Sequence, residues 1–251
     1  VPVATLTTDK TDFAEHQSSV ITATLSAPSV QETVIAFTPT GTAVMDSDYE
    51  LNYTGKGAVT TIAGGNGEGV AANQLYGPRS VAVDVLGNVY VVDEKNNRIQ
   101  KWASGATEGT TVVGELYDPM DAAVDASGNV YLALNQYHGI IKWAPGATTG
   151  TTVAGGNGIG SASNQLRFPT GVAVDALGNV YVADSENHRI QKWAPGASEG
   201  TTVAGGNGNG SAANQLSYPY DVALDTLGNI YIADYHNNRV QKVLLGSTII
   251  I

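Results

Sequence analysis

Residues 171–184 read Gly-Val-Ala-Val-Asp-Ala-Leu-Gly-Asn-Val-Tyr-Val-Ala-Asp, and close copies of this stretch occur three more times in the chain. The copies contain Asp84, Asp125, Asp175 and Asp225 at one position, so they are spaced by 41, 50 and 50 residues. A proline stands six positions before each of these aspartates. Repeats of this length are typical of arrays in which each copy is one structural unit that packs against its neighbours.

Each repeat is expected to form four short strands. In the third copy they are residues 171–175, 180–184, 189–193 and 201–204, which are rich in Val, Ile, Tyr and Thr and are bounded by turn residues. Asp175 to Asn179 is a short hairpin connection, because Gly178 allows positive φ and the Asp side chain can accept backbone N–H bonds.

The first two strands of each repeat are apolar on both faces. Val172 and Val174 point to one side of the sheet, while Ala173 points to the other. Strands of this kind need cover on both sides. A ring of four-stranded blades supplies that cover, since each blade lies between two others, so the pattern predicts an all-β protein with a β-propeller.

The repeated pattern is Pro-x-x-Val-Ala-Val-Asp-x-x-Gly-Asn-Val-Tyr-Val-Ala-Asp-x-x-Asn-x-Arg-Ile-Gln, and it resembles the NHL repeat. Asn187-His188-Arg189-Ile190 matches the stretch that gives that family its name. The resemblance covers residues 59–243 and implies a β-propeller, more often of five or six blades than of four. It implies little about function, because one fold hosts many functions.

The strand count predicts four blades. Residues 59–63 read as a lone fourth strand before the first complete repeat, and the last repeat supplies three strands that end near Val243. We expect a four-bladed ring closed by Thr60–Ala63, because closure removes exposed sheet edges. The alternative is an open arc that is completed by another chain.

The second repeat lacks two charged residues together. Leu134 and Gly139 stand where the other repeats have an Asp and an Arg at the two ends of a turn. Facing positions in a hairpin favour opposite charges. We therefore expect structural ion pairs, rather than three acid–base sites, at Asp93–Arg98, Asp184–Arg189 and Asp234–Arg239.

Residues 1–55 have a different composition and do not repeat. Residues 3–7, 20–25 and 33–37 are predicted to be antiparallel strands. The order that ends in Gly41-Thr-Ala and Asp46-Ser-Asp-Tyr49 resembles the first half of a Calx-beta domain, which is a seven-stranded sandwich. Residues 246–251 read as its next strand. We expect a partial sandwich at 1–55, completed by another strand or chain, and a propeller at 56–245.

The Calx-beta resemblance also implies a calcium site at Glu15, Asp46 and Asp48. Calcium needs 6–8 oxygen ligands, so three carboxylates are too few without the rest of a sandwich. The alternative is that these are solvated loop acids. No other cofactor is expected.

Glycine-rich loops at 64–69, 155–160 and 205–210 lead from one repeat to the next. No Gly-Lys-Ser/Thr follows them, so they are interpreted as linkers and not as phosphate-binding loops. The second repeat is nine residues shorter here, which predicts a groove. The expected rim surface consists of Asn73, Gln74, Asn164, Gln165, Asn214, Gln215, Glu115 and Tyr117.

Asp121 and Asp221 break the repeat pattern near the start of inner strands, where the other repeats have Ser80 and Gly171. They are the candidate channel residues of a second hypothesis, in which the protein resembles NHL-type lyases or hydrolases with a metal in the central channel. Trp102, Trp143 and Trp193 share one repeat position and are interpreted as packing between blades.

The chain has 251 residues, with 12 basic and 23 acidic side chains and no Cys. This acidity argues against nucleic-acid binding, and no apolar run is long enough for a transmembrane helix. The leading hypothesis is a secreted or cell-surface, non-enzymatic propeller that serves as a binding module or as a subunit of an extracellular assembly. Its expected partners are a protein or glycan at a cell surface, or identical subunits.

Overall fold

The structure is a computed structural model that describes residues 4–8, 21–25 and 60–244. Its internal contacts divide the chain into two units, Val1–Ala58 and Val59–Ile251. In the first unit, β1 (Ala4–Thr8) pairs antiparallel with β2 (Ile21–Leu25). These strands fall where two of the three N-terminal strands are predicted. The third strand, the rest of the expected sandwich and residues 246–251 lie outside the described residues.

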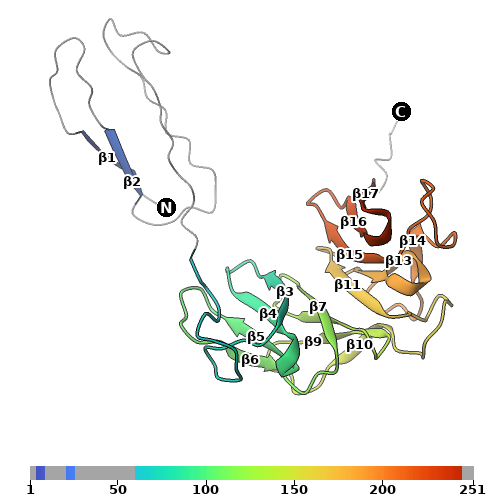
Figure 1. The fold of residues 1–251 in the computed structure, drawn as a ribbon, viewed down its shortest axis with the longest axis horizontal. Helices are drawn as coiled ribbons and strands as arrows, with labels where there is room; N and C mark the ends of the chain where they lie inside the picture. The colour runs from blue at the N-terminus through green and yellow to red at the C-terminus, as the bar shows by residue number, and fades with distance from the viewer. Residues whose placement is uncertain (1–3, 9–20, 26–59, 245–251) are drawn as a thin grey trace, which may run out of the picture. The chain divides into compact units, whose positions relative to one another are not determined.

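The second unit contains four antiparallel sheets, which are the blades of a four-bladed β-propeller (Figure 1). The 3-10 helices η1 (Glu94–Asn96), η2 (Ser185–Asn187) and η3 (Tyr235–Asn237) follow the second strands of blades 1, 3 and 4. Blade 1 consists of β3 (Pro78–Val83), β4 (Val89–Asp93), β5 (Arg98–Trp102) and β6 (Thr110–Val113); blade 2 of β7 (Pro119–Val124), β8 (Val130–Leu134), β9 (Gly139–Trp143) and β10 (Thr151–Gly155); blade 3 of β11 (Pro169–Val174), β12 (Val180–Asp184), β13 (Arg189–Trp193) and β14 (Thr201–Gly205); and blade 4 of β15 (Pro219–Leu224), β16 (Ile230–Asp234) and β17 (Arg239–Val243).

The hairpin between the first two strands of each blade is held by its aspartate. Asp175 Oδ1 accepts hydrogen bonds from the backbone N–H of Leu177 at 3.0 Å and of Asn179 at 2.8 Å. Gly178 lies at φ +80°, a conformation that a residue with a Cβ rarely adopts. The same Asp and Gly recur in all four blades, so the repeated letters of the sequence encode one turn.

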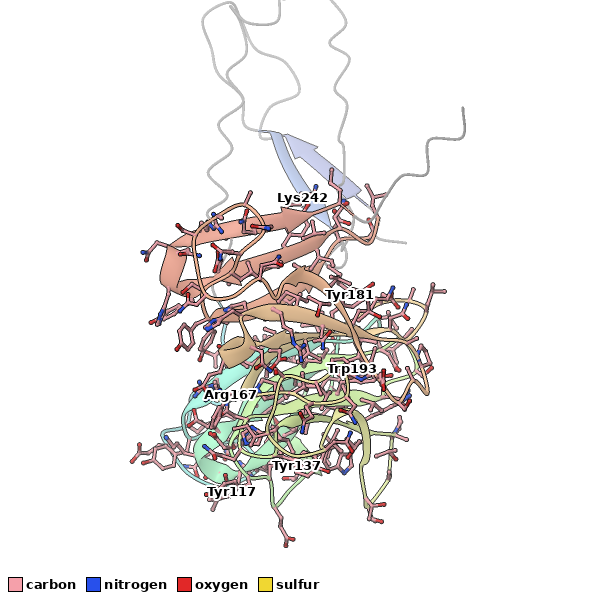
Figure 2. All side chains as sticks on the ribbon, turned by 90° about the vertical axis from the view of Figure 1, so that its right-hand side faces the viewer. Tyr117, Tyr137, Arg167, Tyr181, Trp193 and Lys242 are labelled. Carbon is pink, nitrogen blue, oxygen red and sulfur yellow. The ribbon has the colours of Figure 1, made fainter. Side chains whose placement is uncertain are left out.

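The double-sided apolar strands pack as the propeller argument predicts. In β12, Val180 and Val182 lie in a cluster shared with blade 2, whereas Tyr181 and Ala183 lie in a cluster shared with blade 4. Figure 2 shows Trp193 on the side of blade 3 toward blade 2, and Tyr181 on the side toward blade 4. Alternate residues of one strand therefore serve two different interfaces, which explains why neither face is polar.

Two of the three tryptophans pack between blades, as the sequence predicts, whereas Trp102 packs on Val89 and Val91 of its own blade. Trp193 is 1% exposed and lies in the interface between blades 2 and 3. A Cβ on Gly200 would approach the Trp193 ring to 2.7 Å, so a glycine there makes room for the indole. Trp143 packs in the same way against the cluster between blades 1 and 2.

The expectation that Thr60–Ala63 closes the ring is wrong for this structure. Blade 4 has three strands, and residues 60–63 form none of the described strands. Ala63 packs against the Val89, Val91 and Trp102 cluster of blade 1, while β17 lies on the far side of an open arc (Figure 1). In this position the segment pairs with no strand of blade 4.

Candidate functional site

One end of the blades brings together the residues that depart from the repeat. Pro169, at the start of β11, pairs with Asp184, at the end of β12, so the inner strands begin where the η turns lie. The corresponding residues of the other blades share this register. We call this end the axial rim; it comprises residues 76–79, 94–97, 117–120, 135–138, 167–170, 185–188, 217–220 and 235–238.

The three Asp–Arg pairs lie across the hairpin turns, where the sequence argument expects them. The distances from Arg Nε to Asp Oδ2 are 2.6 Å for Arg98–Asp93 and 2.7 Å for both Arg189–Asp184 and Arg239–Asp234. All three aspartates are fully buried. A buried carboxylate needs such partners, because its charge is costly when it is removed from water.

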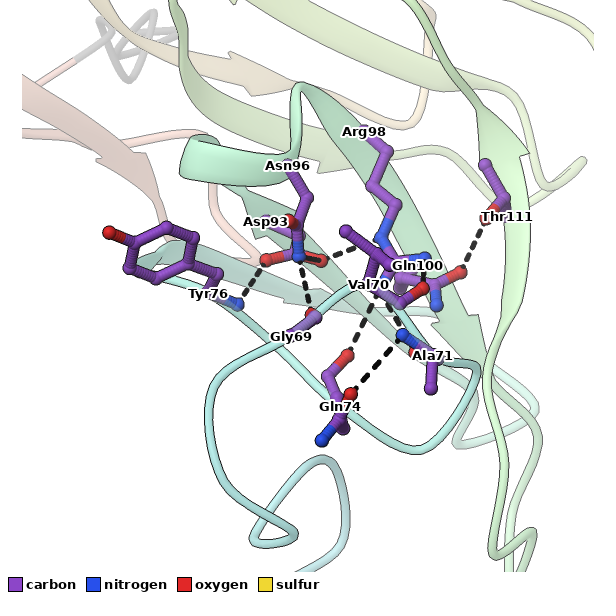
Figure 3. Close-up of polar contacts among 10 residues, drawn as sticks. All are labelled: Gly69, Val70, Ala71, Gln74, Tyr76, Asp93, Asn96, Arg98, Gln100 and Thr111. Carbon is purple, nitrogen blue, oxygen red and sulfur yellow. Dashed lines mark hydrogen bonds and ion pairs between the residues drawn. The ribbon is translucent and has the colours of Figure 1, made fainter.

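Each arginine also binds the linker that enters its blade. Arg189 donates from Nη1 to the carbonyl of Ser161 at 2.9 Å, and from Nη2 to the carbonyls of Ala162 at 3.1 Å and Gln165 at 3.0 Å. Asp184 accepts from the N–H of Arg167 at 2.7 Å. Figure 3 shows the corresponding contacts in blade 1. The pair is thus a clamp on the linker, which the sequence did not reveal.

The clamp explains why the second repeat loses its charged pair together with nine residues. The linker into blade 2 is only residues 114–118, and Leu116 buries its side chain there while its N–H donates to the Asn97 carbonyl at 2.9 Å. Leu134 is buried in the place of the missing aspartate. A cavity of about 340 Å³ lies at this position, where a groove is predicted; it is lined by Glu94, Lys95, Asn97, Tyr117, Asp118 and Gln136.

The amide residues predicted as rim surface hold the linkers. Nε2 of Gln74, Gln165 and Gln215 donates to the carbonyls of Asn66, Asn157 and Asn207, at 3.0 to 3.1 Å. Those same asparagines donate from Nδ2 to the carbonyls of Asn73, Asn164 and Asn214. In the short linker, Glu115 and Tyr117 are exposed, and Tyr117 lines the cavity.

Asp121 joins three blades near the axis. Its Oδ2 accepts from the N–H of Val172 in blade 3 at 2.8 Å, and its Oδ1 accepts from the hydroxyl of Ser80 in blade 1. Burial raises the pKa of Asp121 to about 6, and the nearby Asp221 carboxylate adds to this rise. A buried carboxyl with a raised pKa is a mark of a functional site, although structural networks produce it as well.

Asp221, in blade 4, lies close enough to Asp121, in blade 2, for their charges to interact. Its Oδ1 accepts from the N–H of Val222 at 2.7 Å, and burial raises its pKa. Gly171 of blade 3 faces it, and a Cβ on Gly171 would lie 2.7 Å from the Asp221 Cα. The structure therefore brings the two candidate channel residues together, and Gly171 permits the approach of their blades.

Arg79 bridges the first and the last blade. It donates from Nη2 to the Tyr220 hydroxyl at 2.6 Å and from Nη1 to Glu94 at 3.0 Å. Tyr220 is 41% exposed, so one edge of this bridge faces solvent. The contact between Arg79 and Tyr220 joins positions 141 residues apart.

Aromatic rings line the rim beside this bridge. The ring centroids are 4.6 Å apart for His188–Tyr218, 4.5 Å for Tyr218–His236, 5.2 Å for Tyr235–His236 and 5.7 Å for Tyr220–Tyr235. These distances are in the range of favourable aromatic pairs. We call these five residues the aromatic cluster. Tyr235 is 61% exposed, so part of the cluster is open to a ligand.

Two histidines connect successive blades at the rim. Nδ1 of His188 accepts from the N–H of Tyr218 at 3.2 Å, and Nδ1 of His138 accepts from the N–H of Phe168 at 3.3 Å. Tyr218 has φ +48° and Phe168 has φ +49°, an uncommon conformation for bulky residues that marks positions under constraint. Burial lowers the pKa of His188, which keeps Nδ1 available as an acceptor.

The axial rim and the adjoining residues of the inner strands thus combine aromatic faces, tyrosine hydroxyls, the Arg79 guanidinium and the carboxylates of Glu94, Asp121 and Asp221. Such groups bind a polar molecule that has an apolar face, through stacking and hydrogen bonds. The residues that the structure describes contain no group of three or more His, Asp or Glu placed to hold a metal ion. Glu15, Asp46 and Asp48 lie outside the described residues. No helix in the described segments is long and apolar enough to cross a membrane.

Comparison with known proteins identifies the repeats. The NHL repeat matches residues 75–102, 166–193 and 216–243, so the chain carries NHL repeats. The second copy, which lacks the Asp–Arg clamp, is not among the matched segments. No curated protein matches the sequence.

Solved structures share the fold at low sequence identity. A structural genomics protein of unknown function from Bacteroides thetaiotaomicron superposes with a TM-score of 0.56 at 21% identity, over 65% of this chain and 46% of that one. An auxiliary nutrient binding protein from Bacteroides ovatus gives a TM-score of 0.57 at 18% identity, over 70% of this chain and 50% of that one. Another, from Bacteroides thetaiotaomicron, gives 0.53 at 18% identity, over 65% and 46% of the two chains. This chain matches about half the length of each.

Proposed function

We propose that this propeller of NHL repeats is a non-enzymatic binding module of an extracellular or cell-surface protein, and that its ligand binds at the axial rim. The observation that carries the proposal is the convergence of the aromatic cluster with the Arg79–Tyr220 bridge at the end of the blades. The blades repeat the same packing residues, whereas this group of residues occurs at one place. Because packing does not require it, we infer that it has a role in binding. Two proteins of the same fold are described as auxiliary nutrient binding proteins, which accords with a binding role.

The chemistry of the rim favours a glycan or another hydroxylated nutrient. Exposed Tyr220 and Tyr235 offer ring faces for the apolar side of a sugar, with little loss of side-chain entropy on binding. Asp121, Asp221 and Glu94 supply acceptors for hydroxyl groups, and Arg79 supplies donors. The mixture of ring faces and charged groups is typical of small-molecule sites, in which a few polar groups fix the orientation of the ligand.

A glycan array probed with the labelled full chain tests this proposal. We expect binding to a restricted set of glycans, and we expect Tyr235→Ala to abolish it, because the variant removes an exposed ring without opening the core. Val85→Ala is the matched control, since Val85 is 77% exposed at the β3–β4 turn, at the opposite end of the blade. Equal binding by both variants, or no binding to any glycan, contradicts the proposal.

The N-terminal segment contributes a second part of the proposal. Residues 1–55 form part of a Calx-beta-like sandwich that is completed by residues 246–251 or by a strand of another chain, and Glu15, Asp46 and Asp48 contribute to a calcium site. The support is the sequence resemblance and the antiparallel pairing of β1 with β2. Calorimetric titration of the full chain with calcium tests the site. A Glu15→Gln variant that binds calcium as the parent chain does contradicts it.

A further inference from the structure

Neighbouring blades form three interfaces of one kind, each made by one face of a blade and the opposite face of the next. At the two ends of the arc, blade 1 and blade 4 each leave one such face without a neighbour. One half of the interface is the face that each blade turns toward the next. Ile99, Ile140 and Ile190 occupy this face in blades 1 to 3, and each is 0% exposed. Val240 occupies the same repeat position in blade 4 and is 72% exposed. Blade 4 therefore presents an interface residue to solvent.

The other half is the face that each blade turns toward the preceding one. Ala122, Val172 and Val222 occupy it in blades 2 to 4 and are 6%, 4% and 4% exposed. Val81 occupies the same position in blade 1 and is 62% exposed, and its neighbour Val83 is 60% exposed. Exposed apolar surface of this extent marks an interaction site. Val81 and Val240 occupy the repeat positions that lie on the two sides of each interface inside the arc.

The two ends of the arc also leave backbone edges without a strand partner. Residues 60–67 read Thr-Thr-Ile-Ala-Gly-Gly-Asn-Gly, and residues 201–208, which include β14, read Thr-Thr-Val-Ala-Gly-Gly-Asn-Gly. Strand β14 pairs with β13, and its Ala204 packs against blade 4. Ala63 packs against blade 1 in the equivalent manner but has no strand partner among the described residues. β17 is a third strand whose outer edge carries no described fourth strand.

Among the described residues, blades 1 and 4 do not supply the missing partner to each other. Among the hydrogen bonds of the described residues, only the one from Arg79 to Tyr220 joins blade 1 to blade 4, and it uses two long side chains. No described strand of blade 1 pairs with one of blade 4. If residues 60–64 moved to their own β17, they would leave the Trp102 cluster on which Ala63 lies.

We propose that the occupant is a second copy of this chain, bound head to tail. In this arrangement, residues 60–64 of one copy pair with the edge of β17 in the next, while they stay on their own blade 1. Val240 of one copy then meets Val81 of the other, as Ile190 and Val222 lie on the two sides of the interface between blades 3 and 4. The proposal continues an interface that the chain already forms, and addition of a strand to an open edge is an established mode of recognition. It does not depend on the ligand site at the axial rim.

Single variants measure whether the end faces assemble. Sedimentation analysis of the full chain should show a mass that increases in whole multiples of the monomer as concentration rises. Val240→Lys and Val81→Lys should each prevent growth of the series, because a lysine at either position buries an unpaired charge in the interface. Val85→Lys is the control, since Val85 is equally exposed and apolar but lies at a hairpin tip. Far-ultraviolet circular dichroism should show that all three variants stay folded.

A mixing experiment tests that the two faces are complementary. Val240→Lys retains an intact blade 1 face and Val81→Lys retains an intact blade 4 face, so an equimolar mixture should form a heterodimer of the two variants and nothing larger. Absence of this heterodimer overturns the proposal. A parent chain that is monomeric at every concentration also overturns it, and would point to ring closure within one chain. A Val240→Lys variant that assembles like the parent overturns it too, and would point to assembly through residues 1–55.

Discussion

Arg189 Nε lies 2.7 Å from the carboxylate of Asp184, and the two other nitrogens of the same guanidinium donate to three carbonyls of the linker that enters blade 3. The ion pair is therefore one side of a junction between a blade and the chain before it. The planar, five-donor guanidinium suits this task, because it binds a carboxylate and several carbonyls at fixed angles. A lysine in its place has one nitrogen and no such geometry.

Removal of Arg189 should strongly destabilise the propeller. We expect Arg189→Leu to lower the free energy of unfolding by about 3–5 kcal/mol, because it leaves the Asp184 carboxylate buried without its partner. Urea denaturation followed by tryptophan fluorescence measures the loss. The double variant Asp184→Leu, Arg189→Leu should recover part of it, since the unpaired charge is gone. A double variant that loses as much as the sum of the two single variants would show that the pair is not coupled.

Substitution of Gly171 should separate blades 3 and 4 near the axis. A Cβ at this position would lie 2.7 Å from the Asp221 Cα and 3.0 Å from the Tyr220 carbonyl oxygen, which are backbone atoms that cannot turn aside. We expect Gly171→Ala to destabilise the protein by about 1–3 kcal/mol, the usual range for overpacking. Gly114→Ala is the control, because the nearest atom to its Cβ would be 3.8 Å away. Equal thermal stability of the two variants would refute the close approach of these blades.

Asp121 should make the stability depend on pH in an unusual direction. Burial raises its pKa to about 6 from 3.8, so the folded state holds a proton that the unfolded state has lost in this window. The contribution of this group is fully present below pH 3.8 and is lost as the pH rises through about 6. Asp121→Asn should therefore be as stable as the parent at low pH and more stable at neutral pH. Unfolding measured for both proteins across this range tests the prediction; a parallel pair of curves contradicts it.

His188 should make the stability depend on pH in the opposite direction. Burial lowers its pKa below 6.5, so its neutral form is favoured in the folded state, where Nδ1 accepts from the Tyr218 N–H. Its contribution is present above pH 6.5 and is lost as the pH falls below that value. His188→Asn is the matched variant, because Asn97 and Asn238 occupy the same repeat position with the same left-handed backbone. The variant should remove this part of the pH profile and keep the fold.

The local features of the fold could be predicted from the sequence. The periodic Val, Ala and Tyr residues place the strands, and the Asp–Gly spacing places the hairpins, because both depend on nearest neighbours in the chain. The facing Asp184 and Arg189 also follow from the hairpin, as the register of β12 and β13 shows. The recurrence of residues 171–184 then carries each of these inferences to the other blades.

The ring closure and several contacts could not be predicted, because they depend on the folded arrangement and not on local sequence patterns. Whether Thr60–Ala63 meets β17 depends on the angle between successive blades, which is set by side-chain packing and not by any local pattern. The Arg79–Tyr220 contact joins residues of different blades, and no periodicity signals it. The Nε2 of Gln165 reaches back eight residues to the Asn157 carbonyl, and only the folded linker shows this.

The clamp also sets the boundaries of the piece that gene duplication can copy. Each arginine binds the linker that precedes its own blade. A duplicated unit that begins after β10, with the linker, therefore keeps the clamp and the linker together, whereas a unit that begins at β11 separates them. Expansion or shortening of such an array by whole units of the first kind leaves no buried carboxylate unmatched. The second repeat lacks both the clamp and the long linker, as expected if the two form one structural element.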